Sequence, residues 1–167
     1  SGKTTLLKAL ADVVSDVGTA MIPTRIPKVK GFTLNEFIRL TCFDTPEAKP
    51  DDALGQLSLS HLSNRDISTL SDGEFQKGTI AAAIAKGAEV LLMDEPTAFL
   101  DAENRKNVLT ALKMLCEETG TAVIFSSHDL HESLEVCNKV IALGADRQCR
   151  ISSDNFSAAV AAIFSKD

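Results

Sequence analysis

The chain has 167 residues, 44% hydrophobic and 24% charged, a composition typical of a globular protein and not of a disordered one. Its formal net charge of −6 argues against a nucleic-acid partner, because nucleic-acid binders usually carry a basic patch. No apolar run approaches the ~20 residues that a membrane-spanning helix requires. The chain begins at Ser1-Gly2-Lys3 without an initiator methionine, so we interpret it as an N-terminally truncated fragment of a single domain.

The first half of the chain predicts a helix, a short strand and then a mainly helical stretch. Leucines at helical spacing predict a helix over Thr4–Val14, and Ala20–Ile22 is expected to form a strand. Two prolines and several basic residues predict an exposed loop over Pro23–Gly31. A capping box, Thr-x-x-Glu, is expected to open a helix over Thr33–Leu40, and a further helix is expected over Asp51–Leu59.

The second half alternates helices and strands, which predicts a parallel sheet covered by helices. A second capping box opens an Ala-rich helix, and the apolar run after it is typical of a parallel strand buried on both faces. A third capping box is expected at Asp129. The expected helices are Ser71–Lys86, one that begins after Asp101, Asp129–Cys137 and Phe156–Phe164, and the expected strands are Val90–Met93, Ala122–Phe125 and Lys139–Leu143.

The residues Ser1-Gly2-Lys3-Thr4-Thr5, followed by a helix, match the end of a P-loop. Backbone N–H groups at a helix N-terminus hold polyphosphate, because the helix dipole favours an anion there. Lys3 is then expected to reach the β- and γ-phosphates, and the Thr4 hydroxyl to ligate Mg²⁺. The alternative is a Gly-Lys-Thr helix start without a ligand.

Two carboxylates, Asp94 and Glu95, follow the buried strand directly. Ligands of parallel sheets bind at the carboxyl ends of the strands, so both acids are expected to face a nucleotide. Asp94 would hold Mg²⁺ through its water shell, and Glu95 could polarise an attacking water. The alternative is an acidic loop after a core strand.

Two further groups are expected at phosphate. The block Ser71-Asp72-Gly73-Glu74 starts a helix, and its exposed N–H groups could donate to phosphate oxygens as well as form a capping box. His128 follows the strand Ala122–Phe125, so it also lies at the carboxyl end of a strand, where it could contact a γ-phosphate. The alternative for His128 is an ordinary surface or capping residue.

In their order and spacing, these motifs resemble those of the ATP-binding-cassette (ABC) ATPases. Leu70-Ser71-Asp72-Gly73-Glu74 resembles the family's LSGGQ signature, and the segment 90–96, VLLMDEP, resembles its Walker B strand with the catalytic glutamate. Ala98-Phe99-Leu100-Asp101 resembles its D-loop, and His128 its switch histidine. The resemblance implies an α/β P-loop NTPase fold, with a core over residues 1–24 and 87–167 and a helical signature subdomain over residues 25–86.

The resemblance also implies a mechanism and partners. Two ATPase domains are expected to pair head to tail as a homodimer that binds ATP and Mg²⁺, with Ser71 and Gly73 acting in trans and Asp101 at the dimer seam. The motif details are most similar to bacterial importers of iron–siderophore, haem or cobalamin-type chelates. The segment Pro23–Leu40 would contact a transmembrane permease at the cytoplasmic face of the membrane, and a periplasmic or surface binding protein would act indirectly.

The chain departs from the family pattern at three places. Asp72 stands where the signature usually has glycine, and Thr24 or Arg25 stands where a Q-loop glutamine is expected. The segment before the strand Ala20–Ile22 is also shorter than is usual in the family. Two other functions stay open at this point: an ABC ATPase of DNA repair, chromosome maintenance or translation, and a degenerate module that binds but does not hydrolyse ATP.

Overall fold

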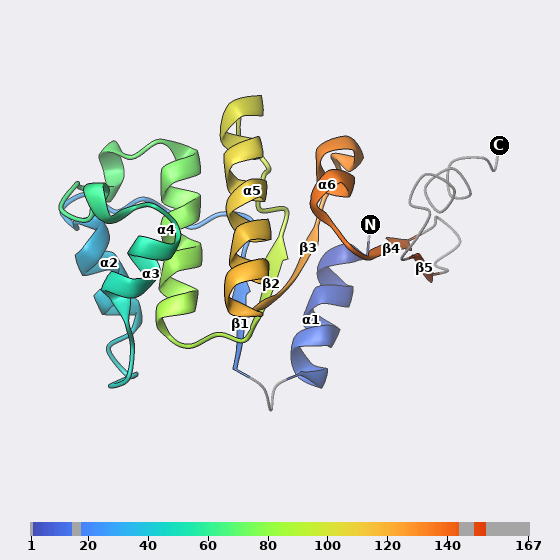
Figure 1. The fold of residues 1–167 in the computed structure, drawn as a ribbon, viewed down its shortest axis with the longest axis horizontal. Coiled ribbons are helices and arrows are strands. Elements are labelled where there is room, and N and C mark those ends of the chain that lie inside the picture. The colour runs from blue at the N-terminus through green and yellow to red at the C-terminus, as the bar shows by residue number, and fades with distance from the viewer. Residues whose placement is uncertain (1, 15–17, 144–148, 153–167) are drawn as a thin grey trace.

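A computed structural model describes residues 2–14, 18–143 and 149–152 of the chain, and Figure 1 shows the arrangement of the elements. The helices are α1 (Lys3–Val13), α2 (Leu34–Thr41), α3 (Pro50–Gln56), α4 (Asp72–Ala85), α5 (Ala102–Thr119) and α6 (Leu130–Val136), with short 3-10 turns at Ser60–Leu62 and Ile67–Thr69. The strands are β1 (Thr19–Ile22), β2 (Val90–Asp94), β3 (Ala122–Ser126), β4 (Val140–Leu143) and β5 (Cys149–Ser152).

A three-stranded parallel sheet in the order β1-β2-β3 confirms the predicted α/β fold. The central strand β2 is the apolar run of the sequence, and the side chains of Leu91, Leu92 and Met93 are fully buried. A strand covered on both faces must be apolar throughout, which is why this segment shows no alternation of polar and apolar residues. The register places Asp94, the last residue of β2, beside Ser126, the last residue of β3.

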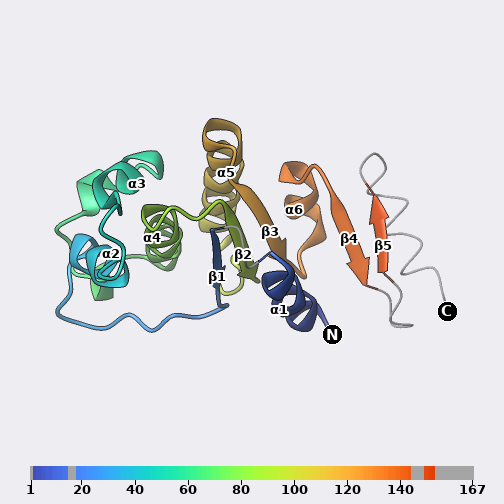
Figure 2. The same ribbon diagram turned by 90° about the horizontal axis from the view of Figure 1, so that it is seen from below.

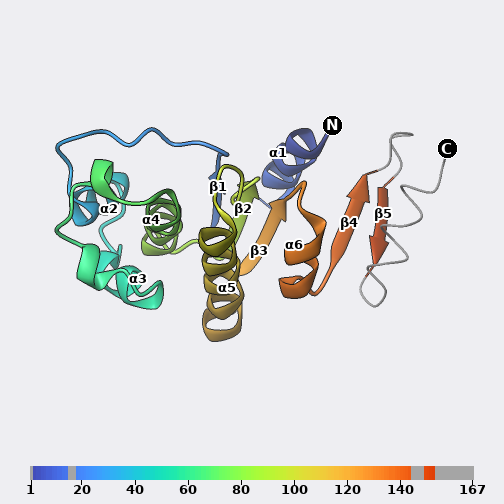
Figure 3. The ribbon, with the colours of Figure 1, turned by 90° about the horizontal axis from the view of Figure 1, so that it is seen from above.

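Helices α1 and α5 lie on opposite faces of this sheet, as Figures 2 and 3 show from below and above. Helices α2, α3 and α4 gather at the side of β1, where Leu34, Ile38 and Ile80 are fully buried and contribute to one continuous hydrophobic core. The irregular segment 23–33 connects β1 to this helical group along the outside of the molecule.

Two of the predicted capping boxes are present. The Thr33 hydroxyl accepts the Glu36 N–H at 3.2 Å, and the Glu36 carboxylate accepts the Thr33 N–H at 2.8 Å. Ser71 and Glu74 form the same reciprocal pair at the start of α4, at 3.2 and 2.7 Å. Each box satisfies two N–H groups that the first helical turn would otherwise leave without partners.

Three expected elements differ from the structure or lie outside it. The helix expected over Asp51–Leu59 ends at Gln56, because Ser58 takes a positive φ of 57° and closes a Schellman motif, with the Leu59 N–H donating to the Leu54 carbonyl at 2.8 Å. The strand expected over Lys139–Leu143 is present as β4, but it pairs antiparallel with β5 instead of extending the parallel sheet. The helix expected over Phe156–Phe164 lies outside the described residues.

Candidate functional site

Asp94 is the centre of a hydrogen-bond network at the carboxyl edge of the sheet. The Thr4 hydroxyl, on the first turn of α1, donates to Oδ2 of Asp94 at 2.8 Å. The Ser126 hydroxyl donates to Oδ1 at 2.7 Å and accepts the backbone N–H of Glu95 at 3.0 Å. Asp94 therefore connects three segments that are distant in the sequence: the start of α1, the end of β2 and the end of β3.

The pKa of Asp94 lies below its ordinary value, as the net result of opposing effects. Burial disfavours the carboxylate and is the largest single influence, acting to raise the pKa. Hydrogen bonds from Ser126, Thr4 and Thr24 stabilise the carboxylate, and the charge of Lys3 adds to them. Together these outweigh the burial, so Asp94 is held as an anion that can accept a cation or its bound water.

Lys3 reaches across the start of α1 toward the loops that follow β2 and β3. Its ammonium lies 3.3 Å from the Ser127 carbonyl and 3.6 Å from Oε1 of Glu95. Gly2, with a φ of 69°, is the N-cap of α1 and offers no side chain to the first N–H groups. Those N–H groups and the Lys3 ammonium form a positive site suited to phosphate.

The structure gives no side-chain contact for the other two P-loop residues of the sequence prediction, Thr5 and Ser1. Thr5 is exposed on the first turn of α1 and makes no hydrogen bond with its side chain among the described residues. Ser1 lies outside the described residues, so the structure does not place it. Of the P-loop residues in the sequence prediction, Gly2, Lys3 and Thr4 therefore lie together at the start of α1, next to Asp94 and Glu95.

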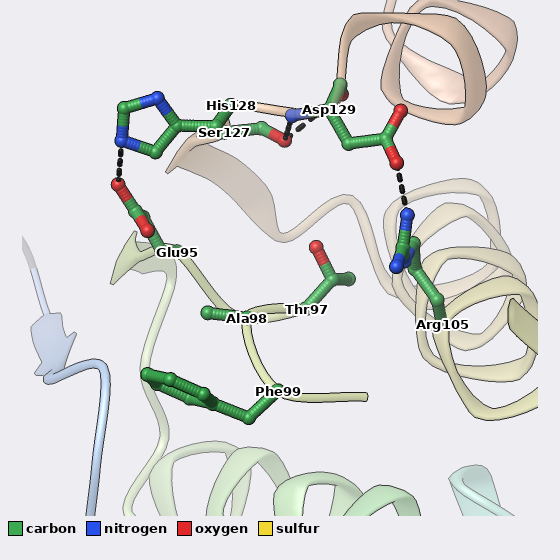
Figure 4. A pocket seen from close by; sticks show the side chains of 8 residues that line it. All are labelled: Glu95, Thr97, Ala98, Phe99, Arg105, Ser127, His128 and Asp129. Atoms are coloured by element: carbon green, nitrogen blue, oxygen red, sulfur yellow. Dashed lines mark hydrogen bonds and ion pairs between the residues drawn. The ribbon is translucent and has the colours of Figure 1, made fainter. Parts of the chain in front are cut away.

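Glu95 and His128 form a direct pair at the open side of the site, with 2.6 Å between Oε1 and Nε2 (Figure 4). Glu95 has a positive φ of 50°, a left-handed conformation that is uncommon for a residue other than glycine. Its side chain is 27% exposed and that of His128 is 69% exposed, so both groups are open to solvent. The pair can hold a water next to a carboxylate, which is the geometry that a general base requires.

Arg105, on α5, is a residue of this site that the sequence prediction missed. Its guanidinium pairs with the Asp129 carboxylate (Figure 4), lies 3.5 Å from Oε2 of Glu132 and donates to the Leu100 carbonyl at 3.3 Å. The predicted capping box at Asp129 is therefore wrong: Asp129 precedes α6 but makes no side-chain cap, because both acids of the box face Arg105 instead. An ion pair across the fold outcompetes the local hydrogen bonds.

Glu95, Arg105 and His128 line an open cleft of about 550 Å³. The backbone of the loop after β2 and the side chains of Glu95 and Phe99 form one wall, while the loop after β3 carries His128 opposite them (Figure 4). The full lining is Glu95, Thr97, Ala98, Phe99, Arg105, Ser127, His128 and Asp129.

The block Ser71–Glu74 lies elsewhere, at the start of α4, and its residues Ser71, Gly73 and Glu74 line a second cavity of about 230 Å³. No residue lines both cavities, so the chain does not bring its own signature block to the cleft beside Glu95. Gly73 packs so closely on α5 that a Cβ at this position would lie 2.9 Å from Cβ of Asn104.

Asp101 caps α5, as the sequence predicts. Its carboxylate accepts the Asn104 N–H at 2.8 Å and the Asn104 side-chain amide at 3.0 Å. Asn104 is thus held by Asp101 on one side and contacts Gly73 on the other, which ties the start of α5 to the start of α4.

The oxygens of Thr4 and Asp94 suit Mg²⁺, a hard cation that prefers carboxylate, hydroxyl and water oxygens. Among the described residues there is no group of three or more His, Cys, Asp or Glu side chains that could hold a metal.

Comparison with known proteins identifies the family of the chain. The family model for ABC transporters matches residues 1–98. The zinc import ATP-binding protein ZnuC of Roseobacter denitrificans is 30% identical in an alignment of 161 positions that covers 89% of this chain and 63% of that protein. The cobalamin import ATP-binding protein BtuD of Halobacterium salinarum is 34% identical over 104 residues, 62% of this chain and 26% of that protein.

A solved structure has the same fold. It is described as an inward-facing conformation of a metal-chelate type ABC transporter, and it aligns with a TM-score of 0.73 and 24% identity over 87% of this chain and 64% of that one. The chain thus spans less than two thirds of the length of the relatives it matches. None of the helices in the described residues is both long and apolar enough to cross a bilayer. By its motifs, its fold and the match over residues 1–98, the chain belongs to the ABC transporter family, as part of an ATP-binding domain.

Proposed function

We propose that this chain binds ATP with Mg²⁺ and hydrolyses it as the ATP-binding subunit of an importer. The observation that carries the proposal is the convergence of Lys3, Asp94 and Glu95 at one edge of the sheet, with Lys3 at 3.6 Å from Glu95. A phosphate-binding cation, a carboxylate suited to Mg²⁺ and a solvent-open carboxylate are the parts that phosphoryl transfer to water requires.

Each residue then has a distinct role. The N–H groups after Gly2 and the Lys3 ammonium bind the phosphates, while Thr4 and Asp94 hold Mg²⁺, which would neutralise phosphate charge. Glu95 accepts a proton from the attacking water, and His128 orients the Glu95 carboxylate through the 2.6 Å contact. The Ser126 hydroxyl fixes both acids, because it donates to Asp94 and accepts from the backbone of Glu95.

A second copy of the chain would complete the site. Ser71, Gly73 and the N–H groups at the start of α4 line a cavity separate from the cleft of Glu95, which supports a role in trans on the nucleotide of the partner. Asp72 and Glu74 belong to the same block, and Asp101 would lie at the dimer seam. ATP binding would close the pair and hydrolysis would open it.

We also propose the division into subdomains that the family resemblance implies. Residues 1–24 and 87–167 would form the P-loop core, and residues 25–86 the helical subdomain that carries the signature. The gathering of α2, α3 and α4 beside β1 supports the division, because α2 and α3 pack on α4 at the side of the sheet away from β3.

A permease is the expected membrane partner, with the segment Pro23–Leu40 as the contact at the cytoplasmic face of the membrane. Val29 and Leu40 of this segment are 52% and 59% exposed, so both are accessible to such a partner. A periplasmic or surface binding protein would act on the permease and not on this chain. We propose an iron–siderophore, haem or cobalamin-type chelate as substrate on the basis of the motif details; the relatives are named for cobalamin, zinc, sulfate or polyamine import.

The test is the variant Glu95→Gln in the presence of Mg²⁺ and ATP. We expect kcat to fall by about 10²- to 10⁴-fold, since a general base contributes that much, and an ATP-bound dimer to accumulate in sedimentation velocity. Glu118→Gln, which changes an exposed carboxylate near the end of α5, is the control and should leave both readouts unchanged. Hydrolysis at the normal rate by Glu95→Gln would show that Glu95 is not the base.

A further inference from the structure

The irregular segment after β1 sends one lysine to the start of α4. The ammonium of Lys28 donates to Oδ1 of Asp72 at 2.6 Å and to the Leu70 carbonyl at 2.7 Å, and it lies 5.7 Å from the centroid of the Phe75 ring. Lys28 is 22% exposed, so three contacts hold its charged end against the protein. None of the sequence motifs includes this residue.

Asp72 stands where the resemblance to the ABC family leads one to expect glycine, and its carboxylate is 68% exposed. Glu74, the other acid of the block, is already bonded to the Ser71 N–H at 2.7 Å. An additional negative charge at the start of α4 would repel the phosphate oxygens that the same helix end has to receive. The Lys28 ammonium compensates that charge within hydrogen-bond distance.

We propose that Lys28 is a positioning residue for ATP-dependent pairing: by neutralising Asp72, it lets the signature block receive an anionic phosphate from a second copy. The inference rests on the proposed function, because it assumes that the block acts in trans on ATP. It adds a specific dependence: residue 28 should matter only when residue 72 is acidic.

The experiment is a double-mutant cycle in the Glu95→Gln protein, which is expected to form an ATP-bound dimer. The readout is the ATP concentration for half-maximal dimer in sedimentation velocity, with Mg²⁺ present. We expect Lys28→Met to raise this concentration by about tenfold, equivalent to about 1.4 kcal/mol. In the Asp72→Gly background, which is the reference of the cycle, adding Lys28→Met should cause no further loss.

Two more variants keep the result interpretable. Lys28→Gln removes the charge but retains a donor for the Leu70 carbonyl. It should weaken the dimer as much as Lys28→Met does, even if Lys28→Met also lowers the thermal stability of the protein. Lys86→Met is the matched control, since Lys86 caps the opposite end of α4 and pairs with Asp44 at 3.2 Å, and it should leave the dimer unchanged.

The inference is overturned if Lys28→Met and Lys28→Gln both dimerise as the parent does. It is also overturned if Lys28→Met weakens the dimer equally with and without the Asp72→Gly substitution, since the lysine would then act independently of that charge. A different result, in which the Glu95→Gln parent itself never dimerises with ATP, contradicts the proposed function and with it the inference.

Discussion

Nε2 of His128 lies 2.6 Å from Oε1 of Glu95, and the same oxygen lies 3.6 Å from the ammonium of Lys3. The Glu95 carboxylate is therefore held between a histidine from the loop after β3 and a lysine from the first turn of α1. It can be oriented from one side and neutralised from the other, and a water or phosphate could enter from the open cleft.

His128→Ala should slow hydrolysis without preventing ATP binding. The carboxylate of Glu95 would keep its charge but lose the contact that orients it, so kcat should fall by about 10²-fold or more while KM changes little. Steady-state phosphate release at saturating ATP measures this. His131→Ala removes an exposed histidine of α6 that pairs with Glu135 at 3.7 Å, and it should have no effect. An unchanged kcat in His128→Ala would exclude the orienting role.

Arg105→Met should destabilise the protein, because Asp129 and Glu132 would face each other without a cation. We expect the free energy of unfolding to fall by about 1–2 kcal/mol, as is typical when a hydrogen-bonded, partly buried charge loses its partner. Urea unfolding followed by circular dichroism measures the change. Lys113→Met, on the same helix, removes an exposed pair with Glu117 at 4.0 Å and should cost no more than about 0.5 kcal/mol. Equal losses in the two variants would contradict the prediction.

Ser71→Ala and Thr33→Ala remove equivalent capping boxes, one inside the signature block and one outside it. Each should lower the free energy of unfolding by about 1 kcal/mol, because a helix loses its N-cap. Only Ser71→Ala should also weaken the ATP-bound dimer of the Glu95→Gln protein. Parallel measurement of unfolding and dimerisation separates the two effects, and a dimer defect of the same size in Thr33→Ala would show that it follows from lost stability.

The carboxylate of Glu74 should contribute stability that is lost in acid. The backbone N–H of Ser71, which donates at 2.7 Å, is the largest cause that lowers the Glu74 pKa below its ordinary 4.5. A lowered pKa in the folded state means that the contribution is complete above the unfolded pKa and disappears as the pH falls through the folded value. The difference in free energy of unfolding between the wild type and Glu74→Gln should therefore shrink below pH 4.5. A difference that stays constant from neutral to acid pH would rule this out.

Local signals in the sequence account for the parts that were predicted. The capping boxes at Thr33 and Ser71 depend on residues three positions apart, and the strand of β2 depends on a contiguous apolar run, so both could be identified from short segments. The placement of Asp94 and Glu95 followed from the same strand, because parallel strands present their carboxyl ends at one edge.

The parts that were not predicted depend on contacts between distant segments. Asp129 and Glu132 have the spacing of a capping box, but Arg105 of α5 takes both carboxylates. The hydroxyls of Ser126 and Thr24 become partners of Asp94 only because β1 and β3 flank β2. Arg105 and Ser126 lie in no recognisable motif, so no local pattern could have indicated them, and Thr24 stands at the Q-loop position without the glutamine expected there.

The close approach of Gly73 to Asn104 restricts how the protein can vary. A methyl group at position 73 would come within 2.9 Å of the Asn104 Cβ, which rotation of the Asn104 side chain cannot relieve. Only a shift of α4 against α5 could make room, and that shift would carry the Asp101 cap with it. Substitutions at position 73 should therefore be accepted only when the spacing of the two helices changes as well. Among proteins that share an ancestor with this one, we therefore expect substitutions at the start of α4 to be accompanied by substitutions at the start of α5.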